Sequence, residues 1–373
     1  MREGWTYKKL GEVATYINGY AFKPSQWSDE GIPIIRIQNL NNQDAVYNYF
    51  NGEVPKKFLV KDGDILISWS ASLGAYEWIG CNAYLNQHIF RVVFDKIKID
   101  KYFFKYAVVS KLIEMGNNAH GATMRHIVKK DFDNTKIPFP PLAEQERIVE
   151  ELDLLSSIIE KKKAQLEEYD KLAQSIFYDM FGDPVTNEKG WEVKKLGVVC
   201  EYSKTRISPD ELTRDNYVGV ENLLQNCKGK EPANKIPNGI GLTRYIDGDV
   251  LIGNIRPYLK KIWLASNEGG CNGDVLAIRR KQEYSTVIIP IYVFGCLSKD
   301  AFFDFDMQYS KGEKMPRGDK KEILKYPICL PPLSLQQKFA DKIEAIERQK
   351  ELIKQSIAET ETLFDSRMDF YFN

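Results

Sequence analysis

The chain has 373 residues, enough for two or three domains that each bury a core of their own, and its 43% apolar and 12% aromatic content is typical of globular protein. Its six cysteines form no Cys-x-x-Cys pair, and its three histidines complete no familiar zinc spacing with them, so we expect reduced cysteines and no bound metal. No stretch of about 18 apolar residues occurs, which indicates a soluble, cytoplasmic protein.

Charge is unevenly distributed, although basic and acidic residues balance at 52 each. Residues 1–141 contain 18 basic and 14 acidic side chains, and residues 182–332 contain 23 and 20. Residues 142–181 contain 5 and 10, and residues 333–373 contain 6 and 8. Two mildly basic segments therefore alternate with two acidic ones, a distribution that permits contact with nucleic acid but does not require it.

The first globular part is predicted to be mixed α/β. Apolar runs of strand length are bounded by Gly, Asp and Asn turns at 32–37, 64–68 and 89–94. Residues 101–115 have helical apolar spacing, which indicates one helix packed on a sheet. The Asp-Gly-Asp sequence at 62–64 precedes an apolar run and is interpreted as a tight turn rather than a metal or catalytic site.

A long helix is predicted next, because nothing breaks a helix between Pro141 and Gly182. Apolar residues recur there at alternating spacings of four and three, the pattern of a coiled-coil seam, with Lys162 as its one clear fault. A helix of about 39 residues is roughly 58 Å long and cannot bury such a stripe alone, so a partner is required. The predicted seam residues are Ile148, Leu152, Leu155, Ile159, Leu166 and Ile176.

The second half of the chain repeats the first with a period near 190 residues, too long for a solenoid. Matched segments follow in the same order: 5–13 with 191–199, 39–40 with 222–223, 62–67 with 247–252, 121–124 with 312–315, and 140–145 with 331–336. We interpret this as a tandem duplication of a globular part followed by a helix. The predicted domains are 1–141 and 182–332, each followed by a spacer helix, 142–181 and 333–373.

The second long helix carries the same stripe, with seam residues Phe339, Ile343, Ile346, Ile353, Ile357 and Phe364. If each helix leaves one domain and leads toward the other, the pair should run antiparallel, which predicts α/β domains in tandem separated by two coiled-coil helices in a pseudo-twofold dumbbell. The alternative is that each helix packs on its own domain. The stripes are widened by further apolar residues, which suggests a third helix from the domains or from another protein. These residues are Ile158, Leu172, Phe177 and Phe181 in the first helix and Phe370 and Phe372 in the second.

Motifs of nucleotide chemistry are missing from the sequence. It contains no phosphate-binding Gly-x-x-x-x-Gly-Lys-Ser/Thr loop, no Gly-x-Gly-x-x-Gly, and no Asn/Asp-Pro-Pro-aromatic signature of an amino-methyltransferase. The Asp-Lys-Lys sequence at 319–321 resembles a nuclease motif only faintly and is interpreted as a solvated charge run. We therefore expect no catalytic residues and no enzymatic activity.

These residues together resemble the specificity subunits of type I restriction-modification systems, across the whole chain. The resemblance rests on Trp-x-x-Lys-Lys-Leu-Gly at the start of both copies and on the Gly-Asp-Ile/Val-Leu-Ile strands. It also rests on Pro-Pro-Leu-x-x-Gln-x-x-Ile at 140–148 and on Ser-Ile-Phe-Tyr-x-Met-Phe-Gly-Asp at 175–183. The second copy departs from the pattern at Leu335, which stands where the first copy has Glu144, and at its end, Phe370-Tyr371-Phe372-Asn373.

The resemblance implies a non-catalytic protein whose two domains each recognise one half of a split, asymmetric double-stranded DNA target. The helices would set the spacing and dock two methyltransferase (modification) subunits, and restriction subunits would complete an endonuclease. S-adenosylmethionine, ATP and Mg²⁺ would belong to these partners, so the chain itself is expected to bind no cofactor. Two domains related by a pseudo-twofold axis could meet one face of DNA about one helical turn, roughly 34 Å, apart.

Candidate DNA-contacting residues lie on loops that offer paired donors and acceptors or basic and aromatic side chains. In the first domain they are Arg36, Gln38, Asn39, Ser68, Trp69, Ser70, Ser72, Asn86, Gln87, His88, Thr123 and Arg125. In the second they are Asn222, Asn254, Arg256, Tyr258, Lys260, Lys261, Asn272, Lys314 and Arg317. For any one of them the alternative is a turn residue or a buried amide that holds a loop.

Two other functions remain open from the sequence: a stand-alone two-headed DNA-binding protein, and a scaffold that binds only proteins. Tight DNA binding by the purified chain would favour the first, although zero net charge argues against it. Co-purification with a methyltransferase that becomes active on a split target would exclude the second.

Overall fold

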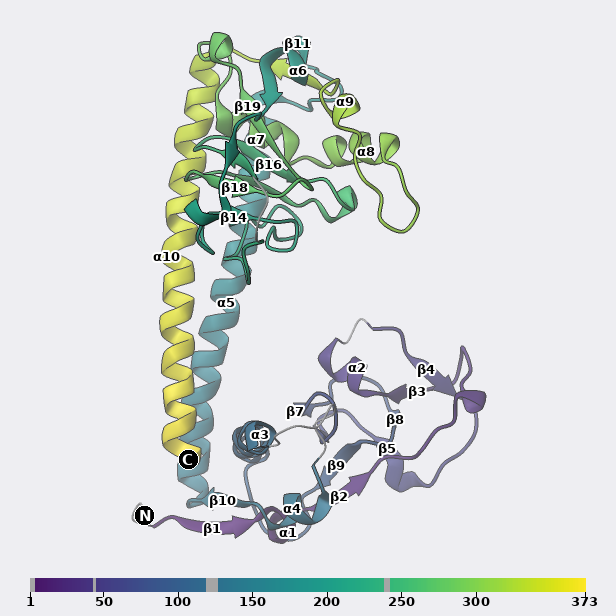
Figure 1. Ribbon diagram of the computed structural model, residues 1–373. Helices are drawn as coiled ribbons and strands as arrows, with labels where there is room; N and C mark the ends of the chain where they lie inside the picture. The colour runs from purple at the N-terminus through teal and green to yellow at the C-terminus, as the bar shows by residue number, and fades with distance from the viewer. Residues whose placement is uncertain (1–3, 43–44, 119–126, 238–241) are drawn as a thin grey trace. The chain divides into compact units, whose positions relative to one another are not determined.

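The computed structural model describes residues 4–42, 45–118, 127–237 and 242–373. Contacts divide the chain into two compact units: unit 1 is Met1–Ala164 with Lys354–Asn373, and unit 2 is Gln165–Ile353. The two long helices expected from the sequence are present, α5 at Leu142–Phe181 and α10 at Leu333–Phe372, and each contributes to both units (Figure 1). The domain boundaries inferred from the repeat stay a prediction.

The described part of unit 1 contains two four-stranded sheets, ordered β2-β9-β6-β7 and β4-β3-β8-β5, and a separate β1-β10 pair. Strands β3 and β8 run parallel, and the other pairs run antiparallel. The strands are β1 Thr6–Lys9, β2 Thr15–Asn18, β3 Ile32–Ile35, β4 Asn48–Phe50, β5 Leu59–Val60, β6 Ile65–Ser68, β7 Gly74–Glu77, β8 Ala83–Leu85, β9 Ile89–Val93 and β10 Lys136–Phe139. The helices are α1 Leu10–Val13, α2 Ile37–Asn41, α3 Lys101–Asn118 and α4 Lys129–Asn134, with short 3₁₀ turns at Pro24–Gln26 and Lys56–Phe58.

The core of unit 1 confirms the helix predicted near residue 101. Helix α3 buries Phe104, Val108 and Leu112 in one apolar cluster with residues of β2, β6 and β9. The strand predicted at 32–37 ends earlier, at Ile35. The reason is local: the Asn39 side-chain oxygen accepts a hydrogen bond from the backbone N–H of Arg36 at 3.0 Å, which starts the turn of α2 in place of further strand.

The described part of unit 2 repeats this plan with one change. Its first sheet has the equivalent order β12-β19-β16-β17, and β11 pairs with β20. Its second sheet, β13-β15-β18-β14, keeps the parallel pair, here β14 with β18. The fourth strand, however, lies beside β15, whereas in unit 1 it lies beside β3 of the parallel pair. The duplicated units therefore share three strands of this sheet and differ in the edge that carries the fourth.

The elements of unit 2 have the following bounds. The strands are β11 Glu192–Lys195, β12 Cys200–Tyr202, β13 Arg206–Ile207, β14 Tyr217–Val218, β15 Leu242–Tyr245, β16 Val250–Gly253, β17 Ile262–Leu264, β18 Gly269–Cys271, β19 Val275–Arg280 and β20 Pro327–Leu330. The helices are α6 Leu196–Val199, α7 Pro290–Leu297, α8 Asp300–Tyr309 and α9 Lys320–Ile323. Short 3₁₀ turns lie at η3 Pro209–Glu211, η4 Pro257–Leu259 and η5 Gln282–Tyr284.

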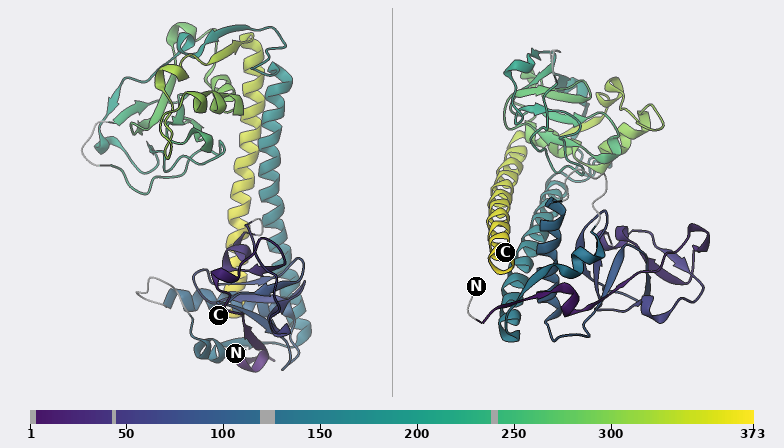
Figure 2. Two further views of the ribbon diagram at one scale, coloured as in Figure 1. Left: turned by 90° about the vertical axis from the view of Figure 1, so that its right-hand side faces the viewer. Right: turned by 60° about the horizontal axis from the view of Figure 1, so that its bottom comes forward.

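Helices α5 and α10 run antiparallel within each unit (Figures 1 and 2). In unit 1, Glu151 binds Arg367 and accepts a hydrogen bond from the Tyr371 hydroxyl. Lys162, eleven residues later in α5, donates to Ser356 and Thr360, which lie eleven residues earlier in α10 than Arg367 and Tyr371. Contact positions that rise along one helix and fall along the other are those of an antiparallel pair. In unit 2, the ammonium of Lys350 pairs with Asp170 at 2.8 Å, and the rings of Phe177 and Phe339 lie 5.7 Å apart. Both predicted stripes face inward: all twelve seam residues are buried or partly buried.

The units themselves supply the third helix that the wide stripes suggested. In unit 1, the Phe103 ring of α3 lies 5.3 Å from Phe372, and the Tyr106 hydroxyl donates to Asp153 at 2.6 Å. In unit 2, Tyr292 of α7 lies 4.7 Å from the Phe181 ring. The ends of α5 and α10 are therefore part of the cores of the units. None of the described helices is long and apolar enough to cross a membrane.

The Asp-Gly-Asp turns have a structural role, as the sequence predicted. Gly63 and Gly248 adopt φ angles of 81° and 82°, which favour glycine, and the following aspartate caps the turn. Asp249 accepts from the backbone N–H of Ile246 at 2.9 Å and from the Arg279 guanidinium at 2.7 and 2.9 Å. In unit 1, Asp64 similarly accepts from the backbone of Lys61 and lies 3.5 Å from Arg91.

Replacing Leu152 with alanine should lower the free energy of unfolding by about 2–5 kcal/mol, because Leu152 is fully buried where α5 joins the core of unit 1. The matched control is Leu154→Ala on the same helix, whose side chain is 62% exposed and whose loss should change stability by less than about 0.5 kcal/mol. Urea denaturation followed by circular dichroism measures both. Equal effects of the two substitutions would contradict this packing.

Asp249→Ala should destabilise unit 2 by about 3 kcal/mol, since it leaves the Arg279 guanidinium, whose side chain is only 24% exposed, without its carboxylate. Asp247→Ala removes an exposed carboxylate from the same turn and should have little effect. Thermal melting of the two variants compares them directly. A melting temperature of Asp249→Ala equal to that of the control would refute the capping role.

Candidate nucleic-acid interface

Three loops of unit 2 that the sequence singled out lie against one another. The backbone N–H of Asn254, after β16, donates to the carbonyl of Asp274, after β18, at 2.8 Å. The backbone N–H of Arg256 donates at 2.7 Å to the carbonyl of Pro316, in the hairpin between α8 and α9. Arg317 of that hairpin pairs with Asp274 at 3.3 Å. We call residues 253–261, 272–274 and 311–318 the unit 2 loop cluster.

Unit 1 has an equivalent cluster of residues 68–74 and 86–88, here called the unit 1 loop cluster. The backbone N–H of Trp69 donates to the carbonyl of His88 at 3.4 Å, and the two rings lie 5.0 Å apart. Thr123 and Arg125, predicted for a third loop, lie outside the described residues. Ile127, the first described residue after them, donates its backbone N–H to the carbonyl of Trp69 at 3.1 Å and therefore lies against this cluster.

Six of the predicted residues are exposed: Gln38 and Gln87 in unit 1, and Arg256, Tyr258, Lys314 and Arg317 in unit 2. The Arg256 guanidinium makes no ion pair or side-chain hydrogen bond with the described residues, and its backbone φ of 54° lies in the left-handed region. Tyr258, two residues further on, is 50% exposed. The unit 2 loop cluster therefore exposes the guanidinium of Arg256, which has no partner among the described residues, and the half-exposed ring of Tyr258 in the same loop. Such groups are suited to phosphate and base contact.

Nine predicted residues are partly buried: Arg36, Trp69, Ser70, Ser72, Asn86, His88, Lys260, Lys261 and Asn272. Arg36 donates to the side chain of Asn48 at 3.0 Å. The Lys260 ammonium pairs with Asp300 at 2.7 Å, and this hydrogen bond raises the pKa of Lys260. The Lys261 ammonium donates to the carbonyl of Val220 at 2.6 Å, and burial lowers its pKa. Arg36, Lys260 and Lys261 already have protein partners, so they are less available to DNA than Arg256, whereas Asn86 Oδ1 and His88 Nδ1 have no hydrogen-bond partner among the described residues.

Four predicted residues are buried: Asn39, Ser68, Asn222 and Asn254. Asn39 and Asn222 occupy matched positions of the repeat, and each side chain forms hydrogen bonds to backbone N–H and C=O groups of its own turn. The Asn222 amide accepts from the backbone N–H of Gly219 at 2.6 Å and donates to the carbonyls of Tyr217 and Glu231. Asn39 accepts from Arg36 and donates to the carbonyl of Ala45. For these two amides the geometry favours the alternative named above, a buried amide that holds a loop.

Two residues near the clusters were not found from the sequence. Asn18 accepts from the Trp69 indole N–H at 3.3 Å, a contact between β2 and a loop 51 residues away that no local pattern reveals. Asp306, on α8, is 1% exposed and lies beneath the unit 2 loop cluster. A signal for Asp306 existed, because it follows the buried Phe302 and Phe303 by four and three residues and therefore shares their helix face.

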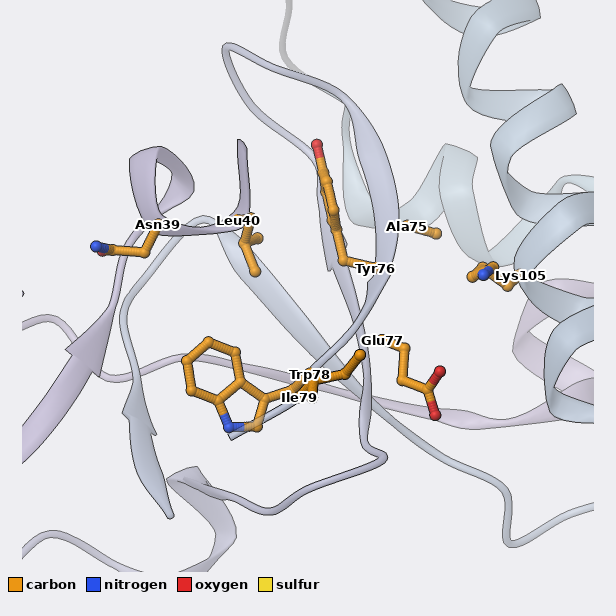
Figure 3. A pocket seen from close by; sticks show the side chains of 8 residues that line it. All are labelled: Asn39, Leu40, Ala75, Tyr76, Glu77, Trp78, Ile79 and Lys105. Carbon is orange, nitrogen blue, oxygen red and sulfur yellow. The ribbon is translucent and has the colours of Figure 1, made fainter. Parts of the chain in front are cut away.

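A hollow of about 300 Å³ lies beside α2, β7 and α3 of unit 1 (Figure 3). Tyr76, Trp78 and Leu40 form its apolar wall, and Glu77 lies toward Lys105 at the other side. Glu77 is engaged by the Lys101 ammonium at 2.9 Å and the Tyr102 hydroxyl at 3.0 Å. Among the described residues, no group of three or more His, Cys, Asp or Glu side chains is arranged to hold a metal ion.

The two units are duplicated α/β domains, and their loop clusters lie at matched positions of the repeat. The model of the type I restriction modification DNA specificity domain matches residues 2–168 and 188–362. The chain therefore belongs to this family and contains the domain twice. It is 24% identical over 383 residues to the type I restriction enzyme EcoBI specificity subunit of Escherichia coli, covering 93% of this chain and 80% of that protein. It is 27% identical over 204 residues to the MjaVIII specificity subunit of Methanocaldococcus jannaschii, covering 53% of this chain and 47% of that protein.

Two solved structures share the fold. The type I restriction-modification S subunit from M. genitalium superposes with a TM-score of 0.55 at 16% sequence identity, covering 99% of this chain and 96% of that one. A chain from a study of complex assembly and conformational transition of the type I R-M system gives a TM-score of 0.58 at 17% identity, covering 99% and 97%. The match to the domain model confirms the family expected from the sequence motifs.

Proposed function

We propose that this chain is the non-catalytic, DNA-reading subunit of a type I restriction-modification complex, and that each loop cluster reads one half of a split target. The observation that carries the proposal is the pair of loop clusters, built at matched positions of a duplicated fold but exposing different side chains. The unit 1 cluster exposes the amide of Gln87, and the unit 2 cluster exposes Arg256, Tyr258 and Lys314. Because amides and guanidinium groups pair with different base edges, the two half-sites should differ in sequence.

The proposed partners are double-stranded DNA, two methyltransferase subunits and, in a full endonuclease, restriction subunits. S-adenosylmethionine, ATP and Mg²⁺ would then be bound by those subunits and not by this chain. Docking of other subunits is supported by large apolar side chains left exposed on the two long helices. They are Leu154 and Leu172 on α5, and Leu352, Leu363 and Phe370 on α10.

Methylome sequencing tests the function directly. A host that carries this chain with a methyltransferase subunit should show a bipartite methylated motif that disappears when the gene for this chain is deleted. Tight sequence-specific binding by the chain alone would instead favour a stand-alone DNA-binding protein. Failure to associate with any methyltransferase or with DNA would favour a scaffold.

Arg256→Ala should weaken DNA binding of the reconstituted methyltransferase by about 1–3 kcal/mol, because it removes the uncommitted cation of the unit 2 loop cluster. If Arg256 contacts a phosphate, the slope of log affinity against log salt should fall by about one. Lys260→Ala removes the same charge from the same loop, but its ammonium is paired with Asp300, so a smaller loss is expected. Unchanged affinity and salt slope for Arg256→Ala, measured by fluorescence anisotropy, would place this loop away from DNA.

Inserting four residues after Leu166 should abolish recognition of the normal target. Four residues add about one helical turn, roughly 6 Å, and break the spacing of the α5 seam. A paired seven-residue insertion, x-x-Leu-x-x-x-Ile after Leu166 and x-x-x-Ile-x-x-Leu after Ile353, keeps both seams in register and serves as the matched control, with recognition moved to a target of altered spacing. Normal methylation of the original target by the four-residue variant would refute a spacing role for the helices.

A further inference from the structure

Asp306 is a carboxylate that the proposed function does not yet use. It lies on the buried face of α8 with Phe302 and Phe303 and is 1% exposed. Neither of its carboxylate oxygens has a hydrogen-bond partner among the residues that the structure describes. An ionised carboxylate in such a place loses its hydration without compensation, so burial favours the protonated, neutral carboxyl group. The hydroxyl of that neutral group then requires a hydrogen-bond acceptor.

Asn254 supplies a matching acceptor. It is 6% exposed, and its side-chain oxygen also lacks a partner among the described residues. Both oxygens lie close to one point beside Gly318: a Cβ atom on this glycine would lie 2.2 Å from Asp306 Oδ1 and 2.8 Å from Asn254 Oδ1. The backbone N–H of Gly318 in turn donates to the carbonyl of Asn254 at 3.2 Å. A side chain at position 318 would collide with both oxygens, so glycine is required where these two side chains lie.

The charged and titratable groups near Asp306 form ion pairs or hydrogen bonds with other residues or are exposed to solvent. Lys311 pairs with Asp319 at 2.9 Å, Arg317 with Asp274 at 3.3 Å and Lys260 with Asp300 at 2.7 Å. The Tyr202 hydroxyl on β12 donates to the carbonyl of Lys320 at 2.8 Å, and Asp304 on the outer face of α8 is exposed. With no cation facing it among the described residues, burial raises the pKa of Asp306 to about 6.

We propose that Asp306 is a positioning residue of the unit 2 loop cluster, and that its neutral carboxyl group donates a hydrogen bond to the side-chain oxygen of Asn254. This bond ties α8 to the segment that carries Arg256 and, through Gly318, to the hairpin that carries Lys314. When Asp306 loses its proton, two acceptors face each other without a donor and the tie is lost. The inference rests on the proposed function, because the tie matters for DNA only if this cluster reads it.

Stability of the free chain tests the protonation without DNA. The pKa of Asp306 is about 6 when folded and close to 3.8 when unfolded, so the folded state binds more protons between these values and wild type loses stability as pH rises from 4 to 6. Asp306→Asn keeps a donor amide at all pH values. The ratio of the folding constants of variant and wild type should therefore grow about tenfold from pH 5 to pH 7. Asp304→Asn, the same change on the exposed face of α8, should show no such growth.

DNA binding by the reconstituted methyltransferase tests the positioning. Relative to Asp306→Asn, wild type should lose affinity as pH rises from 6 to 8, and at pH 8 the variant should bind about 10- to 100-fold more tightly. Asp304→Asn should follow wild type. The pH profile matters because a purely structural loss would weaken binding equally at every pH.

The two measurements separate the possible failures. If the ratio of folding constants stays constant with pH, Asp306 is ionised throughout and accepts from a turned Asn254 amide, which overturns the inference. If the ratio of folding constants grows with pH but the DNA affinities show no pH-dependent difference, Asp306 is protonated as proposed. Its hydrogen bond then does not position the loop cluster for DNA, which also overturns the role assigned to Asp306. If Arg256→Ala is silent as well, it is the proposed DNA site of unit 2 that fails.

Discussion

The mutual burial of α5 and α10 is the interaction on which both units depend. Each helix is 40 residues long and has an apolar stripe that it cannot bury alone, and helix propensity contributes little to the stability of such a helix. The stripes also complete the two cores, because Leu152 and Phe372 belong to the core of unit 1 and Phe177 and Phe339 to that of unit 2. Segments separated by more than 150 residues in sequence must therefore meet before either unit has a closed core.

The polar faults in the stripes are matched to groups on the facing helix. Lys162 donates to the hydroxyl oxygens of Ser356 and Thr360, and Lys350 pairs with Asp170. A partly buried ammonium in a seam is less favourable than leucine, but it is satisfied only where its partners lie opposite it. A shift of α10 by seven residues would bring the hydrophobic Ile353 or the cationic Arg367 to the place of Thr360. The two lysines therefore disfavour other registers of α5 against α10. The aromatic residues at the helix ends stabilise the observed register because they are packed in the cores of the units.

The sequence predicted those features that repeat or have a period. Alternating spacings of four and three predicted both helices, and the duplication predicted two related units with capped Asp-Gly-Asp turns. The strand predicted at 32–37 was too long because the Asn39 side chain competes for the backbone of Arg36. The meeting of three loops around Asp274 was not predictable, since it depends on tertiary contacts between segments with no shared pattern. The burial of two polar side chains, Asn39 in the short helix α2 and Asn222 in a turn, also depends on contacts that no local pattern reveals.

The duplication itself separates residues that hold the backbone from residues that are free to vary. Asn39 and Asn222, and likewise Asp64 and Asp249, are identical in the two copies, and their side chains are engaged by backbone N–H groups of their own turns. Exposed positions of the loop clusters are not shared in this way, as the Arg256 loop shows, where unit 1 has Ala71, Ser72 and Leu73 in the segment after β6. A buried amide or carboxylate that caps a turn cannot be replaced without orphaning a backbone donor, whereas an exposed side chain can change without affecting the fold. Identity between the copies thus marks the framework, and the side chains that differ between the copies on that framework are the ones free to distinguish two ligands.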